Sequence, residues 1–313
     1  MKTLVLSSAG VGSRRWWTAL RDGAALMAIP VIGLQVVHAI LAPTTFTDST
    51  AYYTASAADP YRLSVLSTPG AYLYSPAFLQ AIAPLRALPE WAFVLAIVLA
   101  EAGALWLLTG RNIGWSLFLF LPIWELSVGN INLLLAVAIV VGFSYPAAWA
   151  AVLLTKVTPG VGVLWFAARR EWGSLAAALG ATAAIAAVSF VFAPGQWEAW
   201  LGVLRTNETH PVAEAFAAQL PARVAIAALL VIWGARTDRR WVVPIAAAVA
   251  TPGLSLISAS IVIGAAPFLT KTPLSWRPRR AAAGHPDEVP TLAMPDRSAE
   301  NAAPQTATSG VVQ

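Results

Sequence analysis

The chain has 313 residues, of which 58% are hydrophobic and only 11% are charged. Soluble domains carry about 25% charged residues, so the composition excludes a soluble enzyme and indicates a membrane protein. Cysteine is absent, which excludes a disulfide framework, a thiol nucleophile and a cysteine-ligated metal site. The net charge is +5, but the basic residues form short clusters between apolar runs. That pattern is typical of membrane topology signals and argues against a nucleic-acid partner.

The first apolar run, Ala24–Leu41, is long enough to cross a bilayer. A cleaved secretory signal has a shorter apolar core and a small-residue cleavage site, so we interpret this run as an uncleaved first transmembrane helix. Arg14, Arg15 and Arg21 precede it. Because positive charge beside a span stays in the cytoplasm, the N-terminus is predicted to be cytoplasmic.

Further apolar runs follow, and several are shorter than the roughly 20 residues that a straight span needs. The candidate spans are Trp91–Leu108, Ile113–Ser127, Ile131–Phe143, Ala147–Thr155, Pro159–Ala168, Gly173–Ala193, Ala222–Trp233, Val242–Thr251 and Leu254–Leu269. Together with the first run they predict about ten transmembrane helices.

One segment, Tyr72–Leu88, is difficult to assign because prolines and Arg86 interrupt it. If it spans the membrane, Ala147–Ala168 becomes a single helix with Lys156 near the bilayer centre, where a lysine costs about 2.5–3.5 kcal/mol. If it lies at the outer surface or re-enters, Lys156 falls in an outer turn and can meet water or substrate. We prefer the second interpretation.

With this segmentation the basic residues are distributed very unevenly between the two sides. Fifteen Lys and Arg residues fall on the cytoplasmic side, and only Arg62, Arg86, Lys156, Arg205 and Arg223 fall outside. This bias predicts the orientation of the whole membrane domain, residues 1–270. Residues 271–313 are rich in Pro, Ala, Ser and Thr and are predicted to be a disordered cytoplasmic tail.

Two predicted outer segments, residues 42–90 and 194–221, are large enough to form a site. The first contains Asp48 and Arg62, and the second contains Arg205 and His210. Nucleotide-activated donors are cytoplasmic, so chemistry at this face requires a donor that has already crossed the bilayer. A lipid-linked donor meets that requirement.

Four motifs carry a resemblance to a known family. They are FTDSTAYYTASAADPY, YSPAFLQAIAPLRALP, PIWELSVGNINLLL and LLTKVTPGVGVLWFAARREW. In order and spacing, from about residue 24 to about residue 175, they resemble the GT-C glycosyltransferases of family 87, polyprenol-phosphate-sugar-dependent mannosyl- and arabinofuranosyltransferases of actinobacterial envelope synthesis. Where the family commonly has Gly-Gln, this chain has Gly129 followed by Asn130, whose side chain is shorter by one methylene, and its C-terminal half is shorter.

The resemblance implies a fold and a reaction. The fold is an all-α polytopic bundle of GT-C type with a short amphipathic or re-entrant element in the first outer loop. The reaction is inverting transfer of mannose from a polyprenyl phosphate to a glycolipid or glycan acceptor at the outer face of the cell membrane. Arabinofuranosyl transfer is the alternative within the family. A transporter of short, interrupted helices and a non-catalytic scaffold are the alternatives outside it.

The resemblance also implies residue roles. Asp48 is the expected base, because inverting transfer needs one carboxylate to accept the proton of the attacking hydroxyl. Lys156 is the expected cation for the leaving phosphate, followed by Arg62 and Arg205. The remaining candidates for substrate contact are Tyr52, Tyr53, Glu125, Asn130 and His210. No paired acidic motif accompanies Asp48, so neither a metal ion nor another cofactor is expected.

Each assignment has a structural alternative. Asp48 is also suited to cap a short helix that starts at Ser49, and Lys156 can extend its ammonium group toward lipid headgroups without touching substrate. Glu125 and Asn130 are also suited to hydrogen bonds between helices. Glu101, inside a predicted span, is a functional candidate or a partner for a neighbouring helix.

Overall fold

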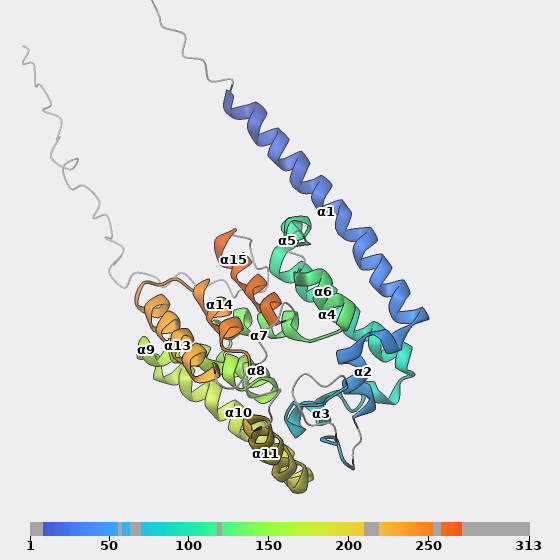
Figure 1. The fold of residues 1–313 in the computed structure, drawn as a ribbon. Coiled ribbons are helices and arrows are strands. Elements are labelled where there is room, and N and C mark those ends of the chain that lie inside the picture. Colours follow the sequence, from blue (N-terminus) through green and yellow to red (C-terminus); the bar gives the residue numbers. More distant parts are fainter. Residues whose placement is uncertain are drawn as a thin grey trace, which may run out of the picture. The chain divides into compact units, whose positions relative to one another are not determined.

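The computed structural model describes residues 9–55, 58–62, 70–117, 121–209, 219–252 and 258–270. The chain divides into two units, residues 1–275 and 276–313, and all of the described residues belong to the first. Every regular element among them is a helix (Figure 1), as the all-α prediction requires. The predicted tail, residues 271–313, lies outside the described residues.

Three described helices are long and apolar enough to cross a membrane: α1 (Ala9–Leu41), α4 (Glu90–Thr109) and α10 (Trp172–Phe192). Of the 18 most apolar consecutive residues in each helix, 56% are buried in α4, but only 17% are buried in α1 and 11% in α10. Apolar helices exposed to this extent require a lipid environment, so the chain is a membrane protein. The predicted spans Trp91–Leu108 and Gly173–Ala193 coincide with α4 and α10.

A further pair of apolar helices is sharply bent. Helices α6 (Leu121–Val128) and α7 (Asn132–Gly142) meet at an angle of 116° and together form either a broken span or a re-entrant loop. The bend falls at Gly129, whose φ is +65°. Glycine adopts this left-handed conformation without the steric cost that a side chain brings.

The remaining apolar runs form shorter helices. They are α5 (Ile113–Leu117), η4 (Pro146–Ala148), α8 (Trp149–Thr155), η5 (Thr158–Val163), α9 (Leu164–Ala168), α13 (Leu220–Arg236), α14 (Val242–Val249), η6 (Ser258–Ala265) and α15 (Ala266–Leu269). By length and composition, the described residues contain three spans, or four if the bent pair counts as one. The prediction of about ten spans is therefore not confirmed.

The first predicted outer loop is folded into short helices: η1 (Pro43–Thr45), α2 (Thr47–Thr54), α3 (Pro76–Ile82) and η2 (Leu85–Ala87). With seven residues, α3 is far too short to span. Lys156 ends α8 and precedes η5. Both observations agree with the interpretation that Tyr72–Leu88 is not a spanning helix and that Ala147–Ala168 is divided at Lys156.

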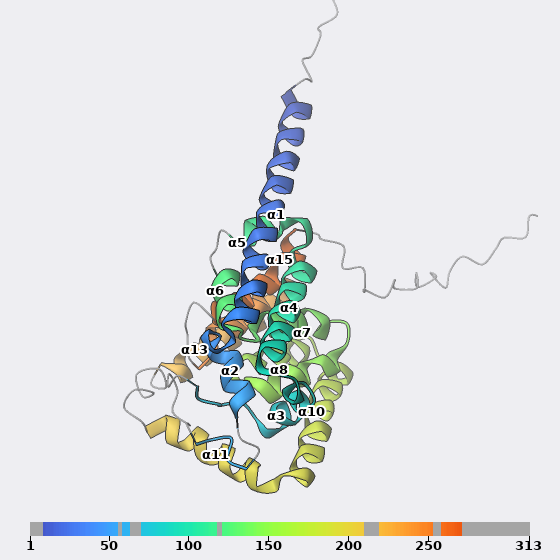
Figure 2. The same cartoon turned by 90° about the vertical axis from the view of Figure 1, so that its right-hand side faces the viewer.

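Two clusters of buried apolar side chains hold these helices together. One joins α2, α3 and α4 and includes Trp200 from α11 (Pro194–Thr209). The other joins α8 and α9 to α13, α14 and η6. In Figure 2, α11 continues from the end of α10 and passes α3. The ends of α2, α3 and α10 thus lie on the same side of the bundle.

We expect Gly129→Ala to destabilise the protein by about 2 kcal/mol, because a left-handed alanine costs about 1–2 kcal/mol. Its Cβ would also lie 2.0 Å from Ser49 Oγ. The measurement is thermal unfolding in detergent. Gly180→Ala is the matched control, since nothing lies within 4 Å of a Cβ at that helical position, and it should be neutral or slightly stabilising. Equal melting temperatures for the two variants would contradict the argument.

Candidate active site

Asp48 is the second residue of α2, whose N-cap is Phe46 and has no side-chain capping bond. The alternative that Asp48 caps a helix starting at Ser49 is therefore wrong. The carboxylate is half-buried and accepts a hydrogen bond from Asn130 Nδ2 at 2.6 Å. Burial raises the pKa of Asp48 above its usual value, and the Asn130 bond and the Lys156 charge oppose that rise.

Asn130 connects the two groups that the sequence singled out as base and cation. Its Nδ2 donates to Asp48, while its Oδ1 accepts from the Ile131 backbone N–H at 2.7 Å and from Lys156 Nζ at 3.5 Å. Asn130 lies in the bend between α6 and α7, only 7% exposed. One amide side chain therefore fixes the carboxylate and the ammonium relative to each other.

Lys156 reaches this amide from the end of α8. Its Nζ also donates to Asn132 Oδ1 and lies 5.8 Å from the centre of the Tyr74 ring, within cation–π range. Burial lowers the pKa of Lys156 below its usual value, and the carboxylates of Glu125, Asp48 and Glu101 oppose that decrease. Asp48, Asn130, Asn132, Tyr74 and Lys156 thus form one polar cluster, and the Lys156 ammonium group is held within it by Asn130 and Asn132. It does not extend toward lipid headgroups.

Two fully buried carboxylates lie behind Lys156, at the N-terminus of α7. Glu125 accepts from the Asn132 backbone N–H at 2.6 Å, from Asn132 Nδ2 at 3.1 Å and from Ser260 Oγ at 2.9 Å. Glu101 Oε1 accepts from the Leu134 backbone N–H at 3.4 Å. The first N–H groups of a helix have no partner within the helix, and here carboxylates supply those partners. Glu125 therefore holds Asn132 in place and has no open side toward a substrate.

A group of tyrosines closes the other side of the cluster. The hydroxyls of Tyr52 and Tyr74 are 2.9 Å apart, and the Tyr61 hydroxyl donates to the Tyr74 carbonyl at 2.9 Å. Tyr52 is only 1% exposed, so it supports Tyr74 from within the core. Tyr74 is half-buried and lies beside Lys156, where it can contact a ligand.

The other predicted contacts are not part of this cluster. Tyr53 is half-buried, and its hydroxyl donates to the Leu88 carbonyl at 3.2 Å. Arg62 and Arg205 are exposed, and none of the contacts found among the described residues brings either guanidinium to Asp48. His210 lies outside the described residues.

Sequence reasoning missed Asn132 and Tyr74. Both lie inside the quoted motifs, in GNINLLL and in YSP. The spacing of Asn130 and Asn132, two amides around one residue before an apolar run, is the signal that was available. Tyr74 had no comparable signal, because its ring becomes relevant only when α3 packs beside α8.

Comparison with known proteins now bears on the function of this cluster. A model of glycosyltransferase family 87 matches residues 72–281. The chain belongs to glycosyltransferase family 87. It is therefore a glycosyltransferase, with a sugar donor and an acceptor as its substrates. Searches of curated proteins and of solved structures found no match.

The family match covers only part of the cluster in this glycosyltransferase. Glu125, Asn130, Asn132 and Lys156 lie within residues 72–281, whereas Asp48 precedes them. The position of Asp48 next to the matched residues therefore rests on the 2.6 Å bond from Asn130.

We expect Glu125→Gln to weaken the cluster, because hydrogen bonds to charged groups contribute about 1.5–3 kcal/mol and the replacement leaves a donor facing Asn132 or Ser260. Thermal unfolding should show a loss of about 2 kcal/mol. In the transferase assay kcat should fall more than KM changes, since Lys156 would lose its fixed position. Ser260→Ala, which removes one donor to the same carboxylate, is the matched control and should have a smaller effect on both. A larger effect of Ser260→Ala would contradict this role.

Proposed function

We propose that this family 87 glycosyltransferase moves a sugar from a polyprenyl phosphate donor to a glycolipid or glycan acceptor, with inversion at the anomeric carbon. The observation that supports it is the Asp48–Asn130–Lys156 arrangement. The amide of Asn130 lies 2.6 Å from the carboxylate and 3.5 Å from the ammonium group. A base and a cation are thus held next to each other, both half-buried.

The proposed reaction uses each group once. The acceptor hydroxyl oxygen attacks the anomeric carbon, Asp48 takes the hydroxyl proton, and the bond from that carbon to the phosphate oxygen breaks. The electron pair leaves with the polyprenyl phosphate, and Lys156 stabilises its developing charge. One carboxylate and one cation suffice for this transfer.

A lipid-linked sugar donor is proposed because of the side of the membrane on which the cluster is placed. We place the cluster at the outer face of the cell membrane, with a cytoplasmic N-terminus, because the basic residues are distributed fifteen to five between the two sides in the predicted topology. Nucleotide donors do not reach that face, and lipid-linked donors do. Mannose is the proposed sugar and arabinofuranose the alternative. The resemblance of the four motifs supports this choice, as it supports a GT-C fold with about ten spans.

We also propose that transfer needs no metal ion. The described residues contain no group of three or more His, Cys, Asp or Glu side chains that could hold one. Glu125 already accepts hydrogen bonds from Asn132 and Ser260, and one carboxylate oxygen of Asp48 accepts from Asn130. Transfer in the presence of EDTA tests this proposal.

We expect Asp48→Asn to lower transfer from a polyprenyl-phosphate sugar in detergent by about 10²–10⁴-fold, because the amide cannot accept the proton. Asp59→Asn is the matched control. Asp59 is an exposed carboxylate in the same loop, and its replacement should leave the rate within about twofold of the parent. If the Asp48 variant transfers sugar as fast as the parent, the assignment of the base is wrong.

The rate should depend on pH in a bell shape. Because the pKa of Asp48 is raised by burial, activity falls as the pH drops through a value above that of an ordinary aspartate. Because the pKa of Lys156 is lowered by burial, activity also falls as the pH rises through a value below that of an ordinary lysine. The measurement is kcat against pH, with thermal unfolding at each pH as the control.

The variant Lys156→Met tests which residue causes each side of this bell-shaped pH–rate curve. It removes the cation and therefore the alkaline limb, and it moves the acid limb to higher pH, since the Lys156 charge lowers the pKa of Asp48. A variant that keeps both limbs in place would contradict the assignment of Lys156.

A further inference from the structure

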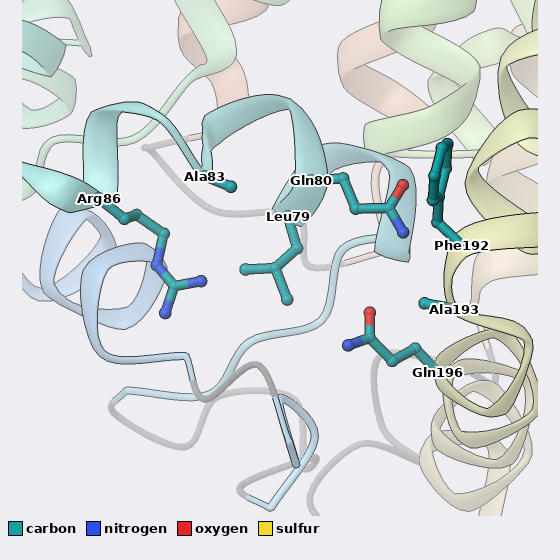
Figure 3. Close-up of a pocket in the computed structure, with 7 residues that line it drawn as sticks. All are labelled: Leu79, Gln80, Ala83, Arg86, Phe192, Ala193 and Gln196. Atoms are coloured by element: carbon teal, nitrogen blue, oxygen red, sulfur yellow. The ribbon is translucent and has the colours of Figure 1, made fainter.

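A cavity lies away from the Asp48 cluster, where α3 and η2 meet the junction of α10 and α11 (Figure 3). Its volume is about 340 Å³, and it is lined by Leu79, Gln80 and Arg86 on one side and by Phe192, Ala193 and Gln196 on the other. The proposed transfer uses none of these side chains.

The position of this cavity along α10 sets its depth in the membrane. The apolar helix ends at Phe192, and α11 begins two residues later at Pro194 with the polar sequence PGQWEAWLGVLRTNET. Val191 and Phe192 are 76% and 79% exposed. A cavity at the end of an exposed apolar span, beside a polar helix, lies at the level of the lipid headgroups.

Arg86 gives the cavity a positive charge. Its Nε donates to the Tyr53 carbonyl at 3.1 Å, and one terminal nitrogen donates to the Ala55 carbonyl. Neutral carbonyls do not cancel the charge of a guanidinium. No carboxylate in the described part of the chain forms an ion pair with Arg86.

The other walls suit an amphiphile. Leu79 and Phe192 supply apolar surface, and in Figure 3 Leu79 lies between Arg86 and the side-chain amides of Gln80 and Gln196. A guanidinium matches a phosphate group, because arginine offers several donors in a fixed plane. The two glutamine amides, on the other side of Leu79, suit the other polar atoms of a lipid headgroup. An apolar wall next to it matches the first carbons of an acyl chain.

We propose that this cavity binds one anionic phospholipid of the surrounding bilayer, with its phosphate on Arg86 and an acyl chain along Phe192. Arg86 also holds the backbone of residues 53 and 55, at the end of the helix that carries Asp48. A bound lipid therefore steadies α2. The site goes beyond the proposed transfer and does not depend on which sugar is moved.

The test is binding of phosphatidylglycerol to the purified full chain in neutral detergent, followed by native mass spectrometry without any sugar donor. We expect one saturable site that prefers phosphatidylglycerol to phosphatidylcholine. Arg86→Gln should weaken binding by about tenfold, the loss of one charge-assisted contact. Arg205→Gln removes the same charge from an exposed position on α11 and should leave the affinity unchanged.

Gln196→Leu is a second variant that tests lipid binding if Arg86→Gln fails to fold. It removes an amide from the cavity and leaves intact the hydrogen bonds from Arg86 to the carbonyls of Tyr53 and Ala55. It should weaken binding severalfold while the melting temperature stays within a few degrees of the parent.

Four results would overturn the proposal. They are equal binding of the two phospholipids, equal loss in the Arg86 and Arg205 variants, equally tight binding of glycerol phosphate without acyl chains, and displacement of phosphatidylglycerol by equimolar polyprenyl phosphate. The last would assign the cavity to the donor. Since no transfer is measured, a failure of the proposed reaction leaves this result intact.

Discussion

The N-terminus of α7 is the constraint on which the site depends. This helix starts in a bend between two apolar segments, so its first backbone N–H groups have no partner within the helix and little access to water. Glu125 and Glu101 accept those hydrogen bonds through their buried carboxylates. Carboxylates buried together repel each other unless a cation is near, and Lys156 is that cation. A requirement of backbone hydrogen bonding thus brings an ammonium group to the bend.

The same requirement positions the base. Lys156 is held by Asn132 and Asn130, and Asn130 in turn donates to Asp48. The fully buried members, Glu125 and Asn132, hold the others, whereas Asp48 and Lys156 are half-buried and can meet a ligand. The buried residues of the cluster therefore position side chains, and the half-buried residues are the ones that can react. Substitution of Glu125 or Asn132 should lower the stability of the protein and also displace Asp48 and Lys156.

The sequence predicted the long helices well and the short ones poorly, for a physical reason. Trp91–Leu108 and Gly173–Ala193 are long apolar runs in which Glu101 is the one charged residue. They are bounded by Pro89, Gly110 or Pro194 and match α4 and α10 closely. Runs of eight to fifteen residues are ambiguous, because the same composition suits half a broken span, a re-entrant helix or a buried core helix. Ile113–Ser127 illustrates this ambiguity, since it contains α5 and most of α6 and ends close to the 116° bend.

The candidate site likewise contains residues that sequence motifs predict and residues that only the packing of the helices brings together. Asp48, Asn130 and Lys156 were predicted from motif order, and the structure brings them together although 82 residues separate the first two. Arg62 and Arg205 were chosen by charge and by side of the membrane alone, and those criteria do not specify a distance. Asn132 was missed because a buried amide beside an apolar run has a purely structural interpretation, and Tyr74 because its neighbour Lys156 comes from a distant helix.

The departure of this chain from the Gly-Gln pattern has a structural explanation in the approach of α2 to the bend. Ser49 Oγ donates to the Gly129 carbonyl at 2.8 Å and occupies the space that a Cβ on Gly129 would need. The backbone of the bend is therefore close to α2, and Asn130 needs only a short side chain to reach Asp48 while its carbonyl oxygen meets Lys156. A glutamine at this position would carry one more methylene than that distance accommodates, so it would have to fold back or move α2 outward. Asparagine at residue 130 and the close packing of Ser49 on Gly129 are thus two parts of one local arrangement, which keeps the proposed base beside the proposed cation.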